Sequence, residues 1–147
     1  MPEAAIRKRT AADKRKGKSP GTQAGEYVKE EMGHIREGKH GARSAKQAIA
    51  IGLSKARRSG VALKAPKSAS ATTRRKATQD TAAAKHATKK VSATRSRATE
   101  SALKREGHSA ASKTALSRHA TTAAKSRSAT SRSAAAKKAA RTRAAGH

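Results

Sequence analysis

Large apolar side chains are concentrated between residues 21 and 63. Within this stretch, Val28, Met32 and Ile35 recur at steps of four and three, which places them on one face of a helix. Ile49, Leu53 and Ala56 repeat the same spacing. The pattern predicts a short helical hairpin over residues 21–63, with a core formed by Val28, Met32, Ile35, Ile49 and Leu53.

The residues between and around these helices favour the same hairpin. Residues 38–41, Gly-Lys-His-Gly, are typical of a turn. Ser44 followed by Gln47 fits a capping box at the start of the second helix, and Gly60 is placed to end it. Three small residues on the second helix would let the two helices approach closely: Ala45, Ala48 and Gly52.

The predicted core is small for a chain that folds alone. Two helices with so few large side chains are marginally stable in isolation. Ile51 lies off the face of Ile49 and Leu53 and would stay exposed on a single hairpin. We therefore expect two hairpins to associate as a homodimer.

The segments on either side of the hairpin contain few large apolar side chains. Residues 1–20 carry seven basic and two acidic residues, and they are expected to form a flexible basic arm. Residues 64–147 contain only Val91, Leu103 and Leu116 as aliphatic side chains larger than alanine. They are expected to form a low-complexity basic tail, in which alanine favours helix and the frequent Ser and Thr weaken it.

The whole-chain composition agrees with this division. Leu, Ile, Val and Phe together number 11 in 147 residues, while the net charge is +27. Low apolar content with high net charge is typical of disorder. The predicted fold class is a mostly disordered chain, all-α where it is ordered, with a short helical hairpin followed by a tail of partial helical propensity.

Several function classes are excluded by the residues present. The chain has no cysteine, which excludes disulfides and thiolate metal sites. It has no apolar run long enough to span a bilayer or to act as a signal peptide, so we expect a cytoplasmic protein. The six histidines lack the i, i+4 spacing of a helical metal pair and nearby carboxylate partners. We expect no catalytic residue, no metal and no cofactor.

The basic residues carry the main functional indication. The tail holds 21 basic residues against three acidic ones, and phosphate attraction is additive and needs no pocket. Some of them recur at seven-residue steps, which on one continuous helix would form a basic stripe. The expected nucleic-acid-binding residues are Arg57, Arg58, Arg74, Arg75, Lys76, Lys89, Lys90, Arg97, Lys104, Arg105, Arg118, Lys125, Arg132, Lys137, Lys138, Arg141 and Arg143.

A short internal similarity links the hairpin turn to the tail. Arg-Glu-Gly at residues 36–38, followed by Ser44, is matched by Arg-Glu-Gly at residues 105–107, followed by Ser112. A decayed second hairpin would explain it, but chance similarity in so biased a sequence is the simpler explanation.

Two stretches resemble known proteins. Residues 39–57, KHGARSAKQAIAIGLSKAR, resemble the core of a bacterial small-basic-protein family of unknown function. The tail is similar in composition to linker-histone carboxyl-terminal tails and to the bacterial histone-like proteins that share them. This second resemblance implies nonspecific DNA binding and nucleoid organisation.

These observations lead to a functional hypothesis. We expect a non-enzymatic, histone-like protein of the bacterial nucleoid that binds duplex DNA without sequence preference and compacts it by neutralising phosphate. Its charge would offset about 46 Å of duplex, near 13 base pairs, so compaction would need many copies. The alternatives are an RNA- or ribosome-associated basic protein and a protein-interaction module that uses the apolar face of the hairpin.

Overall fold

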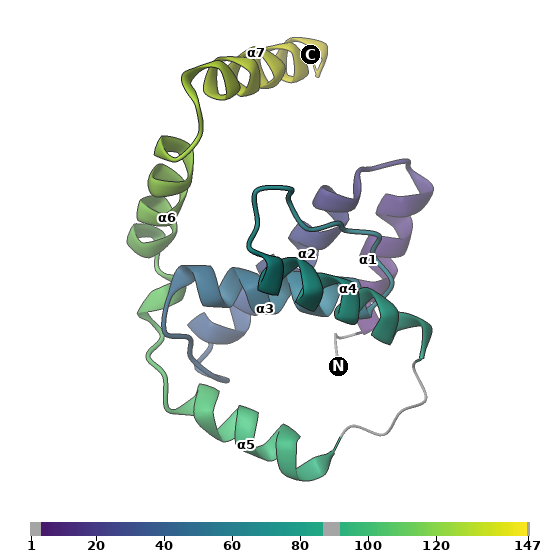
Figure 1. The fold of residues 1–147 in the computed structure, drawn as a ribbon, viewed down its shortest axis with the longest axis vertical. Helices are drawn as coiled ribbons and strands as arrows, with labels where there is room; N and C mark the ends of the chain where they lie inside the picture. The colour runs from purple at the N-terminus through teal and green to yellow at the C-terminus, as the bar shows by residue number, and fades with distance from the viewer. Residues whose placement is uncertain (1–3, 87–91, 147) are drawn as a thin grey trace. The chain divides into compact units, whose positions relative to one another are not determined.

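The structure, a computed structural model, describes residues 4–86 and 92–146. These residues form seven α-helices and one 3-10 turn, and no strand occurs among them (Figure 1). The prediction of a mostly disordered chain is therefore wrong. The elements are α1 (Ala4–Arg15), α2 (Pro20–Arg36), α3 (Ala45–Arg58), α4 (Ala71–Lys85), α5 (Ala93–Lys104), η1 (Ser109–Ala111), α6 (Lys113–Lys125) and α7 (Ala129–Ala145).

Local chemistry explains why helices form in the part of the chain that we expected to be a low-complexity tail. Five helices follow a serine whose side chain accepts the backbone N–H three residues further on; these caps are Ser19, Ser44, Ser70, Ser92 and Ser128. A serine cap stabilises a helix by about 1 kcal/mol, and alanine has the best helix propensity. The tripeptide Ser-Ala-Thr stands at the start of α4, α5 and α7. Serine and threonine, which we expected to weaken the tail helices, thus also define where three of them begin.

The predicted ends of α3 are confirmed. The Ser44 side chain accepts the backbone N–H of Gln47, and the Gln47 side chain accepts the backbone N–H of Arg43 at 2.7 Å. Gly60 has a φ of +95°, a conformation that glycine adopts without strain, and it lies just beyond the end of the helix.

Helices α2 and α3 pack through the small side chains of α3. Ala45, Ala48, Gly52 and Ala56 are all buried. A Cβ on Gly52 would lie 2.7 Å from the Cα of Val28, so the two backbones are in close contact at this point. Helix α3 therefore contacts α2 through the face that carries its small side chains.

The five predicted core residues are not buried equally. Met32 and Ile35 on α2 are buried. Val28, Ile49 and Leu53 are half-buried, because the side chains of α3 that face α2 are the smaller ones.

A first core cluster is completed by residues outside the predicted hairpin. Ile6 of α1 is 3% exposed and packs in one cluster with Tyr27, Val61 and two alanines, Ala24 and Ala56. The hydroxyl of Thr10 in α1 lies 3.4 Å from that of Tyr27. Residues 4–15 are thus a packed helix, where we expected a flexible arm.

This cluster removes the premise of the homodimer prediction. The prediction assumed that the hairpin alone forms the core, whereas Ile6 of α1 and Val61 cover part of it within one chain. The homodimer itself stays a prediction. Ile51, which we expected to be exposed, is half-buried.

Helix α4 packs against α3 through a buried carboxylate. Asp80 accepts hydrogen bonds from the Ser54 hydroxyl at 2.8 Å and from Nε of Arg58 at 2.9 Å. Ala77, one turn earlier, is also buried. The compact part of the chain therefore continues beyond residue 63, into what we expected to be the tail.

The segment after α5 attaches to the turn between α2 and α3. The backbone N–H groups of Gly41 and Ala42 donate to the carbonyls of Leu103 at 2.8 Å and Gly107 at 3.0 Å. Nε of Arg36 donates to the carbonyl of Ala111 at 2.9 Å. The two Arg-Glu-Gly stretches that resemble each other in sequence thus lie where these two segments meet.

The chain divides into two units, one within residues 1–112 and one within residues 113–147. The second unit contains α6 and α7, and neither helix has a buried residue. In the part of the chain that the structure describes, no helix is both long enough and apolar enough to cross a membrane.

Candidate nucleic-acid interface

In the first unit, the acidic residues are engaged by basic ones. Seven of them form ion pairs, among them Asp13 with Lys18 at 2.8 Å and Glu100 with Lys104 at 2.8 Å. The hydrogen bond from Lys104 lowers the pKa of the Glu100 carboxyl, and the hydrogen bond from Lys39 lowers the pKa of the Glu37 carboxyl. The other pairs are Glu26 with Arg9, Glu31 with Lys55, Asp80 with Arg58 and Glu106 with Arg43.

Four of the predicted binding residues have partners within the protein. Arg57 is 8% exposed, and its Nε donates to the carbonyl of Leu63 at 2.9 Å, so it serves the packing of the chain after α3. Arg58 pairs with Asp80, Lys104 pairs with Glu100, and Nε of Arg105 donates to the carbonyl of Ser101. Of these four, Arg57 is the one whose burial removes it from a surface for phosphate.

Other predicted residues of the first unit lie on exposed helix surface. Arg74, Arg75 and Lys76 are exposed near the start of α4, and Arg97 is exposed on α5. Lys89 and Lys90 lie outside the described residues.

The second unit has a different charge balance. Residues 113–147 include nine basic residues and no acidic one. The predicted residues within it are all exposed; Arg118 and Lys125 are on α6, and Arg132, Lys137, Lys138, Arg141 and Arg143 are on α7. These cations therefore have no carboxylate within their own unit to neutralise them.

On α7 the basic side chains lie on two sides of the helix. At 3.6 residues per turn, positions 132 and 143 fall within about 20° of each other around the helix axis. Lys137, Lys138 and Arg141 fall on the opposite side. The 17 residues of α7 extend about 25 Å, so each side presents charge over a length comparable with several phosphates.

The seven-residue basic repeat is not carried by one continuous helix. The helices that would carry it end at Lys85, Lys104 and Lys125. Its described members are therefore distributed over four helices, Lys90 lies outside the described residues, and two successive members share a helix only on α5 and on α6.

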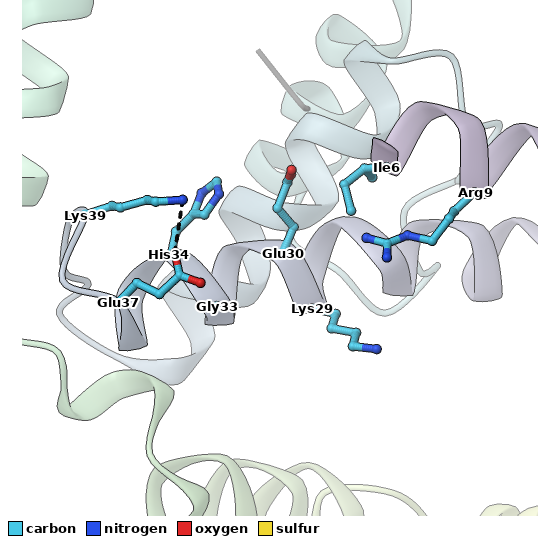
Figure 2. Close-up of a pocket in the computed structure, with 8 residues that line it drawn as sticks. All are labelled: Ile6, Arg9, Lys29, Glu30, Gly33, His34, Glu37 and Lys39. Carbon is cyan, nitrogen blue, oxygen red and sulfur yellow. Dashed lines mark ion pairs between the residues drawn. The ribbon is translucent and has the colours of Figure 1, made fainter. Parts of the chain in front are cut away.

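A shallow pocket of about 230 Å³ lies beside α1 and α2. Its lining includes Arg9, Lys29 and Lys39 together with the carboxylates of Glu30 and Glu37 (Figure 2). Because charges of both signs line it, this pocket is a weaker attractant for an anion than the second unit.

The sequence interpretation missed two features of the structure. The first is the set of Ser-Ala-Thr repeats at helix starts, which could have been found because serine is a preferred cap. A cluster of Glu31, His34 and His40 was missed because its third member comes from the turn after α2, and a search for i, i+4 histidines cannot find such a residue.

We compared the chain with protein-family models, curated proteins and solved structures, and none of them matched.

Proposed function

We propose that this protein binds duplex nucleic acid, DNA foremost, without sequence preference and brings duplex segments together. The observation that carries the proposal is the second unit, with nine basic residues, no acidic residue and no buried residue in either helix. Helices without a fully buried residue gain little stability from a core, and their exposed cations are available to phosphate. Neutralising phosphates releases condensed counterions, which drives binding to any duplex sequence.

The residue types favour contacts with the phosphate backbone of the nucleic acid over contacts with its bases. Specific readout relies on side chains set in a groove by a fixed scaffold, and stacking relies on aromatic rings. Tyr27 is the one aromatic residue of the chain apart from histidine, and it is 1% exposed, so it is committed to the core. The charge of the second unit offsets about 15 Å of duplex, or four to five base pairs.

The two-sided charge of α7 supports bridging. A helix with cations on opposite sides can contact two duplexes at once, or one duplex and a second copy of the complex. Bridging of this kind compacts DNA without any base contact.

The test is salt-dependent binding to a fluorescent duplex of about 30 base pairs, with a variant of α7. Replacing its five cations by Gln should weaken binding and reduce the slope of log K against log salt by up to about 4.5. Gln is used because its helix propensity is close to that of Lys and Arg. The replaced residues are Arg132, Lys137, Lys138, Arg141 and Arg143.

The matched control removes the same amount of charge from five Lys and Arg side chains that already form ion pairs with carboxylates. Its five replacements by Gln are at Arg9, Lys18, Lys39, Arg43 and Lys104. The salt slope should then change by less than half as much. Equal slopes for the two variants, or a strong preference for one duplex sequence, would contradict the proposal. A duplex RNA of the same length, tested in parallel, decides between DNA and A-form partners.

A further inference from the structure

Three side chains that could bind a metal ion lie together at the end of α2. Glu31 and His34 are three residues apart on this helix and so share a face. His40 returns towards them from the turn that follows. One ligand atom from each of the three lies within 4.8 Å of the other two.

Glu31 is the most buried member, with a side chain that is 1% exposed. One carboxylate oxygen, Oε2, accepts a hydrogen bond from Nζ of Lys55 on α3. The other, Oε1, lies 2.9 Å from Nε2 of His40, but this contact lacks hydrogen-bond geometry. Among the described residues, Oε1 is thus a buried acceptor that receives no hydrogen bond.

The second nitrogen of His40 explains why this contact is unusual. Nδ1 of His40 lies 3.1 Å from the carbonyl oxygen of Gly41, which can only accept a hydrogen bond. Nδ1 therefore carries a hydrogen, and in a neutral ring Nε2 has a lone pair and lies 2.9 Å from the carboxylate oxygen of Glu31. Two lone pairs at this distance repel each other, and a cation between them would turn the repulsion into attraction.

The geometry matches what surrounds histidine ligands in metal sites. A metal-bound histidine usually donates its other ring N–H to a carbonyl or carboxylate, as His40 does to Gly41. The ring of His34 meets that of His40 edge to face, with centroids 6.1 Å apart and planes at 82°. In a tetrahedral zinc site, the ligand atoms are about 3.4 Å apart, so small side-chain rotations would bring the three donors to that spacing.

The charges around the cluster must be compatible with a cation. Lys55 faces Glu31 from α3. Lys39 and His34 line the same pocket (Figure 2). The Lys39 ammonium is 3.0 Å from the carboxylate of Glu37, which offsets its charge. Lys55 is held on the oxygen of Glu31 away from His40, leaving Oε1 for a ligand.

We propose that Glu31, His34 and His40 bind one divalent first-row transition metal ion, with Zn²⁺ as the best fit. Two imidazoles and one carboxylate form a donor set that suits zinc, whereas calcium and magnesium prefer sites made of oxygen atoms. Three protein ligands leave a fourth position for water. The bound ion would join α2 to the turn whose Gly41 and Ala42 hold the segment after α5.

The experiment uses the full-length protein after treatment with a chelator. Titration with Co²⁺ should give a visible absorption band that saturates at one ion per chain, and Zn²⁺ should displace it. His34→Gln and His40→Gln should each weaken Zn²⁺ binding at least tenfold. His119→Gln, on α6, is the matched control and should bind as the unchanged protein does.

A second measurement needs no substitution, in case a variant does not fold. In histidine ring NMR spectra of the unchanged protein, one equivalent of Zn²⁺ should shift the signals of His34 and His40 and leave those of His86, His108 and His119 in place. Failure to saturate at one ion, or shifts confined to the other histidines, would overturn the proposal. In that case, the cluster is a buried ion-pair network of Glu31, Lys55 and His40.

Discussion

Residues 4–112 and residues 113–146 are built from the same kind of helix but are stabilised differently. In both regions, alanine-rich helices start at serine caps. In the first, four helices share buried contacts, among them Tyr27, Ile35 and Asp80. In the second, α6 and α7 bury no residue. Helix formation in this protein therefore depends on local sequence, whereas compactness depends on a small number of side chains.

The two regions also differ in what happens to their charge. The first region contains eight of the nine acidic residues of the chain, and seven of these hold basic side chains in ion pairs. The second has basic residues alone. Exposed pairs contribute little stability, but they reduce the cationic charge available to a polyanion. The first region therefore supplies the packed core, and the unpaired charge of the second supports the proposal that it binds phosphate.

The largest expected effect comes from Tyr27, which fills the centre of the first region at 1% exposure. Tyr27→Ala should lower the free energy of unfolding by about 3–5 kcal/mol, because it leaves a cavity among Ile6, Ala24 and Val61. Urea unfolding followed by circular dichroism measures the loss. Tyr27→Phe keeps the ring and gives up only the contact with Thr10, so it should cost about 1 kcal/mol or less. A loss below 1 kcal/mol for Tyr27→Ala would mean that the first region is no more packed than the second.

How far the sequence predicts this fold can be judged from particular residues. The periodicity of Val28, Met32 and Ile35 located α2, and Ser44 with Gly60 located the ends of α3. Such features are local, so they can be read from neighbouring positions. Ile6 looked isolated because it is the one large aliphatic of α1, and its packing partners lie from 18 to 57 residues away.

The disorder prediction failed for a related reason. Low apolar content argues against a large core, and eight of the thirteen buried apolar residues are indeed alanines. It does not argue against alanine helices with serine caps, which need little burial. Of the predicted binding residues, Arg57 was misread, because its hydrogen bond to Leu63 depends on a chain reversal that no local pattern indicates.

The second prediction concerns α4, the helix of the tail that joins the first region. Asp80→Ala should lower the free energy of unfolding by about 1–3 kcal/mol, because it leaves Ser54 and Arg58 without their shared acceptor. Glu100→Ala is the matched control, since Glu100 also forms an ion pair, with Lys104, but on an exposed surface. It should change stability much less than Asp80→Ala does, because exposed ion pairs contribute little. Equal effects of the two substitutions would show that α4 is not held by Asp80.

The third prediction compares two glycines of the hairpin helices. Gly52→Ala should destabilise the first region by about 1–2 kcal/mol, because the added Cβ would meet the backbone of Val28 at 2.7 Å. Gly25→Ala, at a position on α2 with open space around it, should stabilise the protein by about 0.5–1 kcal/mol. Thermal unfolding of both variants gives the signs. If both substitutions stabilise, the helices do not approach as closely as the packing of Gly52 requires.

The smallest effect is expected in the second region, where a cap can be removed without disturbing any core. Ser128→Ala takes away the side chain that accepts the backbone N–H of Ser131 at the start of α7. The loss of about 1 kcal/mol should reduce the ratio of helix to coil in α7 about fivefold, because no tertiary contact of a buried residue compensates. Carbon chemical shifts of residues 129–145 in the full-length protein report this change.

The matched control for the cap lies in the same helix. Ser133→Ala replaces an exposed interior serine of α7 by the best helix former, so it should raise helix content slightly. Neither substitution should move the unfolding midpoint of the first region, whose buried side chains they do not touch. If Ser128→Ala leaves the shifts of α7 unchanged, this helix is held by contacts with other parts of the chain or with a second molecule. The division into a packed region and a locally stabilised one would then fail, and with it the argument that the cations of α7 are fully available to phosphate.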